Sequence, residues 1–546
     1  MRSIPETWRR RIAGLCMPAA AAILGAGALA ACSGGPDAPL LARAGRPLAC
    51  ELASLQRVGL DRASVDAVQA VPAGSFTPPG ARGPLADMPA FCRVQGTTRA
   101  VPGSAVRFEL WAPLPAAWNG KLLATGNGGY SPALKYEDMA LALRRGYATL
   151  GGDTGHGGED LLFVVGHPQR MVDWGTSSVH DITVAGKALL AALQARPARR
   201  SYFHGCSTGG HQGYAEVQRY PADFDGVIAG APGNNRVALN AEFLNRFLAN
   251  HASGDNQRPI LTRDKLELVT RKAVAACDAL DGVRDGVIAD PRACDARRFD
   301  AASLRCSAGA EGADCLGDAQ LAAVRRIYAG AVNPRTGETI YPGPAVGSEA
   351  GWAGYLGTTE PARADFWRHW VFGDPGWDWW RFDFDRHMAK ALAKVGPAVD
   401  QTNPDIAAFK ARGGKLITYM GWADPVVSPH DTIAYYEKVA ARQGSLAATQ
   451  DFFRLFMVPG MGHCGGGTGP TRFGNQGGEV QAPSPRNDLL AALDAWVEQG
   501  RAPEALVAHG EGSGAAAPTR LLCAYPKQAR HDGAGPSDRA AHYDCR

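Results

Sequence analysis

The segment SYFHGCSTG at residues 201–209 decides the fold. It begins as a short apolar strand and ends in Gly205-Cys206-Ser207-Thr208-Gly209, a G-x-S-x-G pattern that occurs once in the chain. This pattern is typical of a sharp strand-to-helix turn that exposes a serine hydroxyl as a nucleophile. In a chain with 67 glycines the pentapeptide also arises by chance. The interpretation therefore depends on its neighbours.

Two cysteines make the interpretation sharper. Cys206 directly precedes Ser207, and Cys464 directly follows His463. A nucleophilic serine needs a histidine within hydrogen-bond reach. A disulfide between the two cysteines would hold their Cα atoms roughly 4.4–6.8 Å apart. This separation is close to the one that a serine–histidine pair requires, so a Cys206–Cys464 bridge would enforce the proximity.

The order of the remaining candidate residues agrees with a hydrolase triad. In α/β-hydrolases the serine is followed along the chain by the acid and then by the histidine. Asp424 follows the apolar stretch 415–419, and His463 lies in a glycine-rich loop after the stretch 453–458. Taken singly, an Asp-Pro turn and a loop histidine are ordinary features. Together they predict a triad of Ser207, His463 and Asp424.

Several short apolar runs end in Gly- or Asp-containing turns, and an amphipathic helix is predicted between two of them. Strands that alternate with helices favour a mostly parallel α/β sheet, whose ligand sites lie at the carboxyl ends of the strands. The sequence therefore predicts an α/β-hydrolase fold. The predicted strands are 121–125, 147–151, 201–204, 227–229, 415–419 and 453–458, and the predicted helices are 179–194 and 487–499.

The strand pattern breaks in the middle of the chain, which becomes irregular and dense in tryptophan. We interpret this part as a large lid domain inserted into a discontinuous core. The predicted organisation is a signal peptide at 1–31, the first part of the core at 32–233, the inserted lid at 234–413 and the second part of the core at 414–546.

An oxyanion hole needs two backbone N–H groups close to the nucleophile. The N–H of Thr208, which follows the serine, is one candidate. The second comes from the glycine-rich turn after the strand 121–125, where backbone can approach a ligand closely. We choose Gly129 over Gly128 in this turn. The alternative interpretation is a simple tight turn.

The N-terminus resembles an export signal. Three arginines at 9–11 precede an Ala-rich apolar stretch at 12–29, and Leu29-Ala30-Ala31-Cys32 follows, as in bacterial lipoprotein signals that end in a lipidated cysteine. A plain signal peptide and an uncleaved anchor are the alternatives. The expected location is the cell envelope, as a lipoprotein of the periplasm or outer membrane, or the medium. The net charge of +4 with dispersed basic residues excludes a nucleic-acid partner.

An even number of cysteines in an exported protein predicts disulfides. Ten remain after Cys16 and Cys32 are set aside. Their number alone does not fix the connectivity, but local spacing suggests three pairs and leaves four residues for two more. The suggested pairs are Cys277–Cys294, Cys306–Cys315 and Cys523–Cys545, followed by Cys50–Cys92 and Cys206–Cys464.

A second candidate site lies in the predicted lid. Asp278, Asp281 and Asp285 fall within eight residues, and oxygen-rich loops of this kind suit a calcium ion. The backbone carbonyls of Val283 and Val287 would complete the ligand set. Such an ion would be structural, and the alternative is a solvated acidic loop.

An aromatic run at 366–384 contains five tryptophans, two of them adjacent. It could line a pocket for a flat substrate. The core of the lid is the favoured interpretation, because large aromatic side chains dominate protein cores.

These motifs together resemble the tannase and feruloyl esterase family, which also contains the hydrolase of mono(2-hydroxyethyl) terephthalate. The resemblance covers most of the mature chain. The matching stretches are GCSTGG at 205–210, GWAD at 421–424, GHC at 462–464, the loop 277–285 and the stretch 377–384.

The resemblance implies the triad, the Cys206–Cys464 bridge and a calcium-carrying lid with Asp278, Asp281, Val283, Asp285 and Val287 as ligands. It implies a serine carboxylic ester hydrolase for small esters of aromatic acids, released from a plant polymer or a polyester. The terephthalate monoester hydrolase has a glutamate after its nucleophile and an aromatic residue three positions after its acid.

This chain has Thr208 and Val427 at those two places. The departures favour a phenolic ester, such as a hydroxycinnamate or gallate, over a terephthalate monoester. A rival of another class is a non-catalytic envelope binding protein on a hydrolase scaffold. Acyl transfer to an alcohol is a further alternative.

Overall fold

The computed structural model describes residues 46–81, 83–307, 312–512 and 517–546. The predicted signal peptide and Cys32 lie outside these ranges. The described residues form one compact unit. In the described part of the chain, we find no helix with both the length and the apolar character needed to cross a membrane.

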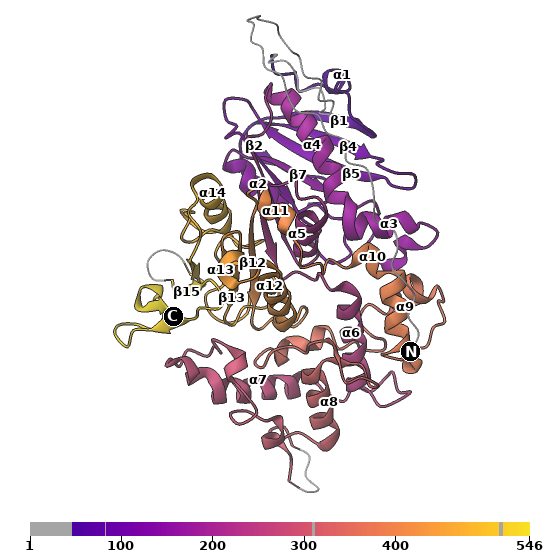
Figure 1. The fold of residues 1–546 in the computed structure, drawn as a ribbon, viewed down its shortest axis with the longest axis vertical. Helices are drawn as coiled ribbons and strands as arrows, with labels where there is room; N and C mark the ends of the chain where they lie inside the picture. Colours follow the sequence, from indigo (N-terminus) through magenta and orange to yellow (C-terminus); the bar gives the residue numbers. More distant parts are fainter. Residues whose placement is uncertain (1–45, 82, 308–311, 513–516) are drawn as a thin grey trace, which may run out of the picture. The chain divides into compact units, whose positions relative to one another are not determined.

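A mixed sheet of nine strands forms the centre of this unit (Figure 1). Its spatial order is β1-β4-β5-β7-β6-β8-β9-β12-β13. Neighbouring strands pair in parallel from β7 through β6, β8, β9 and β12 to β13. On the other side of β7, the strands β5, β4 and β1 continue the sheet in antiparallel register. The bounds are β1 Ala63–Val71, β4 Phe91–Thr98, β5 Val106–Pro113, β6 Lys121–Thr125, β7 Ala148–Gly152, β8 Arg200–Cys206, β9 Gly226–Gly230, β12 Lys415–Gly421 and β13 Phe453–Val458.

The predicted α/β-hydrolase fold is confirmed, and all six predicted strands are present within about two residues of their predicted ends. The antiparallel strands were not predicted. In β4 and β5 a buried ion pair between Arg93 and Glu109 interrupts the apolar runs. Because of these charges the two strands lack a continuous apolar pattern in the sequence, although they are largely buried.

Helices cover both faces of the sheet. Successive strand residues point to opposite faces: Phe203 of β8 packs in a cluster with residues of α4, α5 and α12, whereas Tyr202 packs in another cluster with residues of α14. The bounds of these and the other core helices are α1 Leu52–Leu55, α2 Tyr136–Arg144, α3 Pro168–Val172, α4 Ser178–Gln194, α5 Thr208–Arg219, α12 Pro429–Gln443, α13 Leu446–Gln450 and α14 Leu489–Gln499.

The predicted lid contributes most of the remaining helices, and it contains a hydrophobic cluster drawn entirely from residues 249–356. This cluster lies within the single compact unit, so the boundaries at 234 and 413 stay predictions. The helices are α6 Arg236–Asn250, α7 Arg263–Cys277, α8 Asp318–Ala329, α9 Arg386–Lys394, α10 Gly396–Val399 and α11 Ala407–Ala411.

Eight short strands form four antiparallel pairs outside the central sheet. The pairs are β2 Gly74–Phe76 with β3 Leu85–Met88, β10 Ala331–Val332 with β11 Thr339–Tyr341, β14 Ala505–His509 with β15 Thr519–Cys523, and β16 Ala529–His531 with β17 Tyr543–Cys545.

Five disulfides link the described part of the chain in the pairing that the spacing suggested. They are Cys50–Cys92, Cys206–Cys464, Cys277–Cys294, Cys306–Cys315 and Cys523–Cys545. Bridges in this number are typical of exported proteins that fold in an oxidising compartment.

Candidate active site

Ser207 sits on a strained turn between β8 and α5. Its backbone has φ 62° and ψ −115°, a conformation that a non-glycine residue rarely adopts. Glycines allow the crossing of strand and helix: a Cβ on Gly205 would lie 2.6 Å from the Cα of Gly209, and one on Gly210 would lie 2.2 Å from the carbonyl oxygen of Gly230. The G-x-S-x-G segment therefore forms the sharp turn that the sequence predicted.

The three predicted triad residues lie within hydrogen-bond distance of one another. His463 Nε2 is 2.8 Å from Ser207 Oγ, and His463 Nδ1 is 2.7 Å from Asp424 Oδ2. The carboxylate of Asp424 is buried, whereas the side chain of His463 is 20% exposed. The serine end of this hydrogen-bonded triad therefore faces solvent-accessible space. This arrangement can pass a proton from the serine hydroxyl to the imidazole.

Backbone groups fix the carboxylate of Asp424. Its Oδ1 accepts hydrogen bonds from the N–H groups of Val426 at 2.7 Å and Val427 at 3.0 Å. The other oxygen, Oδ2, is left for His463. The turn after β12 therefore orients the carboxylate independently of its hydrogen bond to His463.

The Cys206–Cys464 bridge joins the neighbours of the serine and the histidine, with a Cα–Cα distance of 5.9 Å. Gln476 supports the same turn, since its side-chain oxygen accepts a hydrogen bond from the Cys206 N–H at 3.0 Å. The bridge connects the end of β8 with the loop after β13, two segments 258 residues apart in sequence.

A cavity of about 480 Å³ opens beside Ser207 and His463. Both apolar and polar side chains line it, and the rings of Phe243 and Tyr355 stack at 5.6 Å between centroids. The apolar lining is Leu239, Phe243, Tyr355, Val426 and Val427, and the polar lining includes Lys135, Glu137, Asp138, Arg236, Arg363 and Gln476.

The aromatic run at 366–384 does not line this cavity. Phe366, Trp367 and Trp370 are buried in the hydrophobic core, and the rest of the run packs against it. The interpretation of this run as core is confirmed.

The loop after β6 contacts the start of α5. Thr208 Oγ1 donates a hydrogen bond of 2.7 Å to the carbonyl oxygen of Gly129, whose φ of 57° suits a glycine. Thr208 follows Ser207 in the chain, and Gly128 and Gly129 line the same cavity as Ser207. The structure thus brings together the two segments from which the oxyanion hole was predicted.

Two arginines at the cavity were missed by sequence reasoning. Arg236 begins α6, three residues after a glycine-rich turn, and Arg363 belongs to an irregular segment of the lid. Arg363 has a φ of 64° and lies over the ring of Tyr130 at 5.1 Å. The position of Arg236 after a strand-end turn was a usable signal, whereas nothing in the sequence marks Arg363.

The acidic lid loop is held by its own backbone. Asp278 accepts hydrogen bonds from the N–H groups of Asp285 and Gly286, Asp281 accepts one from Val283, and Asp285 pairs with Arg520. Among the described residues, no three His, Cys, Asp or Glu side chains gather closely enough to hold a metal ion. Burial, and secondarily the charge of Asp285, raises the pKa of Asp281.

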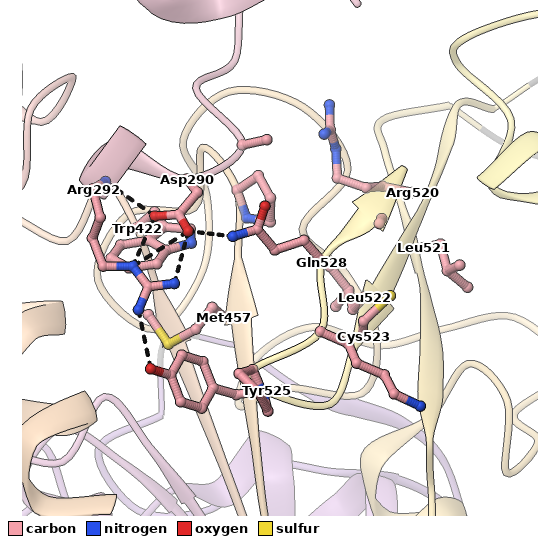
Figure 2. Close-up of a pocket in the computed structure, with 15 residues that line it drawn as sticks. Asp290, Arg292, Trp422, Met457, Arg520, Leu521, Leu522, Cys523, Tyr525 and Gln528 are labelled. Atoms are coloured by element: carbon pink, nitrogen blue, oxygen red, sulfur yellow. Dashed lines mark hydrogen bonds and ion pairs between the residues drawn. The ribbon is translucent and has the colours of Figure 1, made fainter. Parts of the chain in front are cut away.

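A second, smaller cavity of about 40 Å³ is lined by Trp422 and by residues of the segments 289–292 and 520–529 (Figure 2). Arg292 is its central group: the guanidinium lies 5.3 Å from the ring centroids of both Trp422 and Tyr525 and pairs with Asp290. Because Trp422 is two residues before Asp424, this cluster packs the lid against the turn that carries the acid.

The nine-stranded sheet and the Ser207–His463–Asp424 geometry define an α/β-hydrolase. The model of the tannase and feruloyl esterase family matches residues 92–546. The chain therefore belongs to that family, and it is a carboxylic ester hydrolase.

Individual relatives support this assignment. An uncharacterised esterase of Xanthomonas campestris is 39% identical, covering 93% of this chain and 92% of its own. Feruloyl esterase B of Aspergillus niger is 33% identical, and the match covers 79% of this chain and 82% of the relative. The crystal structure of feruloyl esterase B from Aspergillus oryzae has a TM-score of 0.84 at 30% identity, covering 90% of this chain and 98% of its own.

Proposed function

We propose that this protein hydrolyses esters of aromatic, phenolic acids, with Ser207 as nucleophile. The observation that carries the proposal is the continuous hydrogen-bond chain from Ser207 through His463 to Asp424, in a cavity that is also lined by the rings of Phe243 and Tyr355. Its volume of about 480 Å³ suits a single substituted ring. Several relatives are named as feruloyl esterases.

In the proposed reaction, Ser207 Oγ attacks the ester carbonyl while His463 Nε2 takes its proton. The backbone N–H groups of Thr208 and Gly129 stabilise the oxyanion. His463 then gives the proton to the leaving alcohol, which departs and leaves an acyl-serine. A water molecule, deprotonated by His463, attacks this ester, and His463 returns the proton to Ser207 Oγ as the acid is released. Asp424 holds the imidazole with its Nδ1–H toward the carboxylate throughout.

The test is a panel of methyl ferulate, methyl gallate and mono(2-hydroxyethyl) terephthalate with the wild-type protein and Ser207→Ala. We expect turnover of a phenolic methyl ester that the variant loses while its thermal unfolding stays unchanged. Turnover retained by the pure variant would overturn the assignment of Ser207. No turnover of any ester, including a chromogenic acetate, would favour a binding protein. Products formed with added methanol separate hydrolysis from acyl transfer.

One observation favours a terephthalate monoester as the second candidate substrate. The guanidinium of Arg363 lines the cavity and makes no hydrogen bond or ion pair with another described residue. A free guanidinium is a ready partner for the carboxylate of a monoester. Arg363→Gln should raise KM for the terephthalate monoester about tenfold and leave methyl ferulate unchanged. Arg386→Gln, which removes an exposed arginine paired with Asp383, is the control.

We further propose a structural calcium ion in the lid. The donor chemistry of Asp278, Asp281 and Asp285, three carboxylates within eight residues, suits a hard cation. The carbonyls of Val283 and Val287 would add ligands. Asp285 would exchange its contact with Arg520 for the ion. No step of the reaction uses this ion.

The N-terminal segment carries one more proposal, lipid attachment at Cys32. The supporting feature is the Leu-Ala-Ala-Cys box. Expression in a bacterial host followed by membrane fractionation tests it: the wild-type protein should sediment with membranes, and Cys32→Ser should not. Equal distribution of the two would reject the anchor.

A further inference from the structure

Arg236, the first residue of α6, is a buried cation beneath the nucleophile turn. Only 6% of its surface is exposed. Its Nη2 donates a hydrogen bond of 3.2 Å to Thr208 Oγ1. The guanidinium also faces two aromatic rings, with centroids at 5.1 Å for Trp174 and 5.8 Å for Tyr130. Residues from three separate segments therefore enclose its side chain.

The buried carboxylate of Asp400 attracts this cation but forms no ion pair with it. In the described part of the chain Arg236 forms no ion pair, and its Nε has no hydrogen-bond partner. Burial lowers its pKa. Arg246 on the same helix is also buried, but its charge is neutralised by an ion pair with Glu242 at 2.9 Å. A buried, unpaired guanidinium is costly, so its place beside Ser207 calls for a reason.

A chain of two hydrogen bonds connects Arg236 with the loop after β6. Arg236 donates to Thr208 Oγ1, and Thr208 Oγ1 donates to the carbonyl oxygen of Gly129. Thr208 and Gly129 are the residues whose backbone N–H groups are proposed to bind the oxyanion. Arg236 also lines the cavity that contains Ser207. Its charge thus lies at the point where the two halves of the oxyanion hole meet.

We propose that Arg236 is the positioning residue of the oxyanion hole and supplies it with a fixed positive charge. Through Thr208 it holds the two N–H groups in register, and its field favours the negative charge that develops on the carbonyl oxygen. An unpaired charge acts strongly in a site from which water is excluded. Because the oxyanion exists only near the transition state, the effect falls on kcat and not on KM. The inference rests on the proposed esterase function.

The experiment compares wild-type protein, Arg236→Met, Arg236→Lys and Thr208→Val on a neutral chromogenic acetate. Arg236→Met should lower kcat about 10²-fold, the effect of losing an oxyanion-hole contact, with KM changed less than threefold. Arg236→Lys should recover part of the loss. Thr208→Val keeps the cation but breaks the link to Gly129, and it should lower kcat about tenfold, with Thr208→Ser restoring it.

The inhibition constant of phenylboronic acid, which forms an anionic tetrahedral adduct with serine, separates an electrostatic role of Arg236 from a packing role. A packing role would not affect this anionic adduct selectively. Arg236→Met should weaken the boronate by the same factor as kcat and leave the affinity of a neutral, non-hydrolysable benzamide unchanged. Equal weakening of both inhibitors, or an unchanged kcat, would overturn the proposal. If Arg236→Met does not fold, an unchanged kcat in Thr208→Val would overturn it. Inactivity of the wild-type protein would instead reject the proposed function.

Discussion

The Cys206–Cys464 bridge closes a loop of 258 residues across the proposed active site, and its removal should affect stability and activity together. In the chain-entropy model, a loop of this length contributes about 5.5 kcal/mol to the free energy of unfolding. This figure is an upper value, because two further bridges already lie inside the loop. The matched control is Cys306→Ser/Cys315→Ser, whose loop of 9 residues corresponds to about 2.6 kcal/mol in the same model.

The assay is urea unfolding followed by tryptophan fluorescence, together with kcat/KM on methyl ferulate. Cys206→Ser/Cys464→Ser should lose about 3 kcal/mol more than the control, the difference between the two loop terms. It should also lose about 10²-fold in kcat/KM, since misplacement of a catalytic group by roughly 1 Å costs that much. The control should keep its activity.

Two results would refute this reasoning. A stability loss no larger than that of the control would show that loop closure does not set the contribution of the bridge. Wild-type kcat/KM in the Cys206→Ser/Cys464→Ser variant would show that contacts such as the Gln476 hydrogen bond to the Cys206 N–H hold the serine in place without the bridge.

Three further predictions test the acid, the core and the lid. Asp424→Asn should lower kcat by about 10³–10⁴-fold with little change in stability, because an amide favours the wrong imidazole tautomer; a loss below tenfold would contradict the triad. Burial, aided by the charge of Arg236, lowers the pKa of His211 to about 3. The free energy of unfolding therefore decreases as the pH drops below the unfolded-state pKa of about 6.5, and the loss is about 2 kcal/mol at pH 5. His211→Gln should unfold with a flatter pH dependence between pH 7 and 5; parallel curves would reject this. EDTA should lower the melting temperature of the wild-type protein by several degrees and leave the melting temperature of Asp281→Asn unchanged. Calorimetry with EDTA and with added Ca²⁺ measures both, and equal shifts in the two proteins would argue against the lid calcium.

The sequence predicted the fold class and the candidate triad because both depend on short, local patterns. A G-x-S-x-G turn, apolar runs that end at glycines and cysteines beside Ser207 and His463 are readable in one dimension. The spacing of the other cysteines likewise anticipated the remaining bridges. Strand β13 was predicted to the residue, since its apolar run is continuous and ends in Pro459-Gly460.

Other features required the tertiary structure. Strands β4 and β5 were hidden because Arg93 and Glu109, charged in sequence, neutralise each other inside the sheet. For the aromatic run 366–384 the sequence favoured a core over a pocket but left both open, and only packing decided for the core.

The electrostatic character of the cavity is likewise a tertiary property. Arg236 meets Trp174, 62 positions earlier in the chain, and Arg363 meets Tyr130 across a still longer separation. Local sequence determines which backbone turns form, because turn geometry depends on neighbouring residues. The charges that surround the nucleophile depend on contacts between distant segments, and those exist only once the chain has folded.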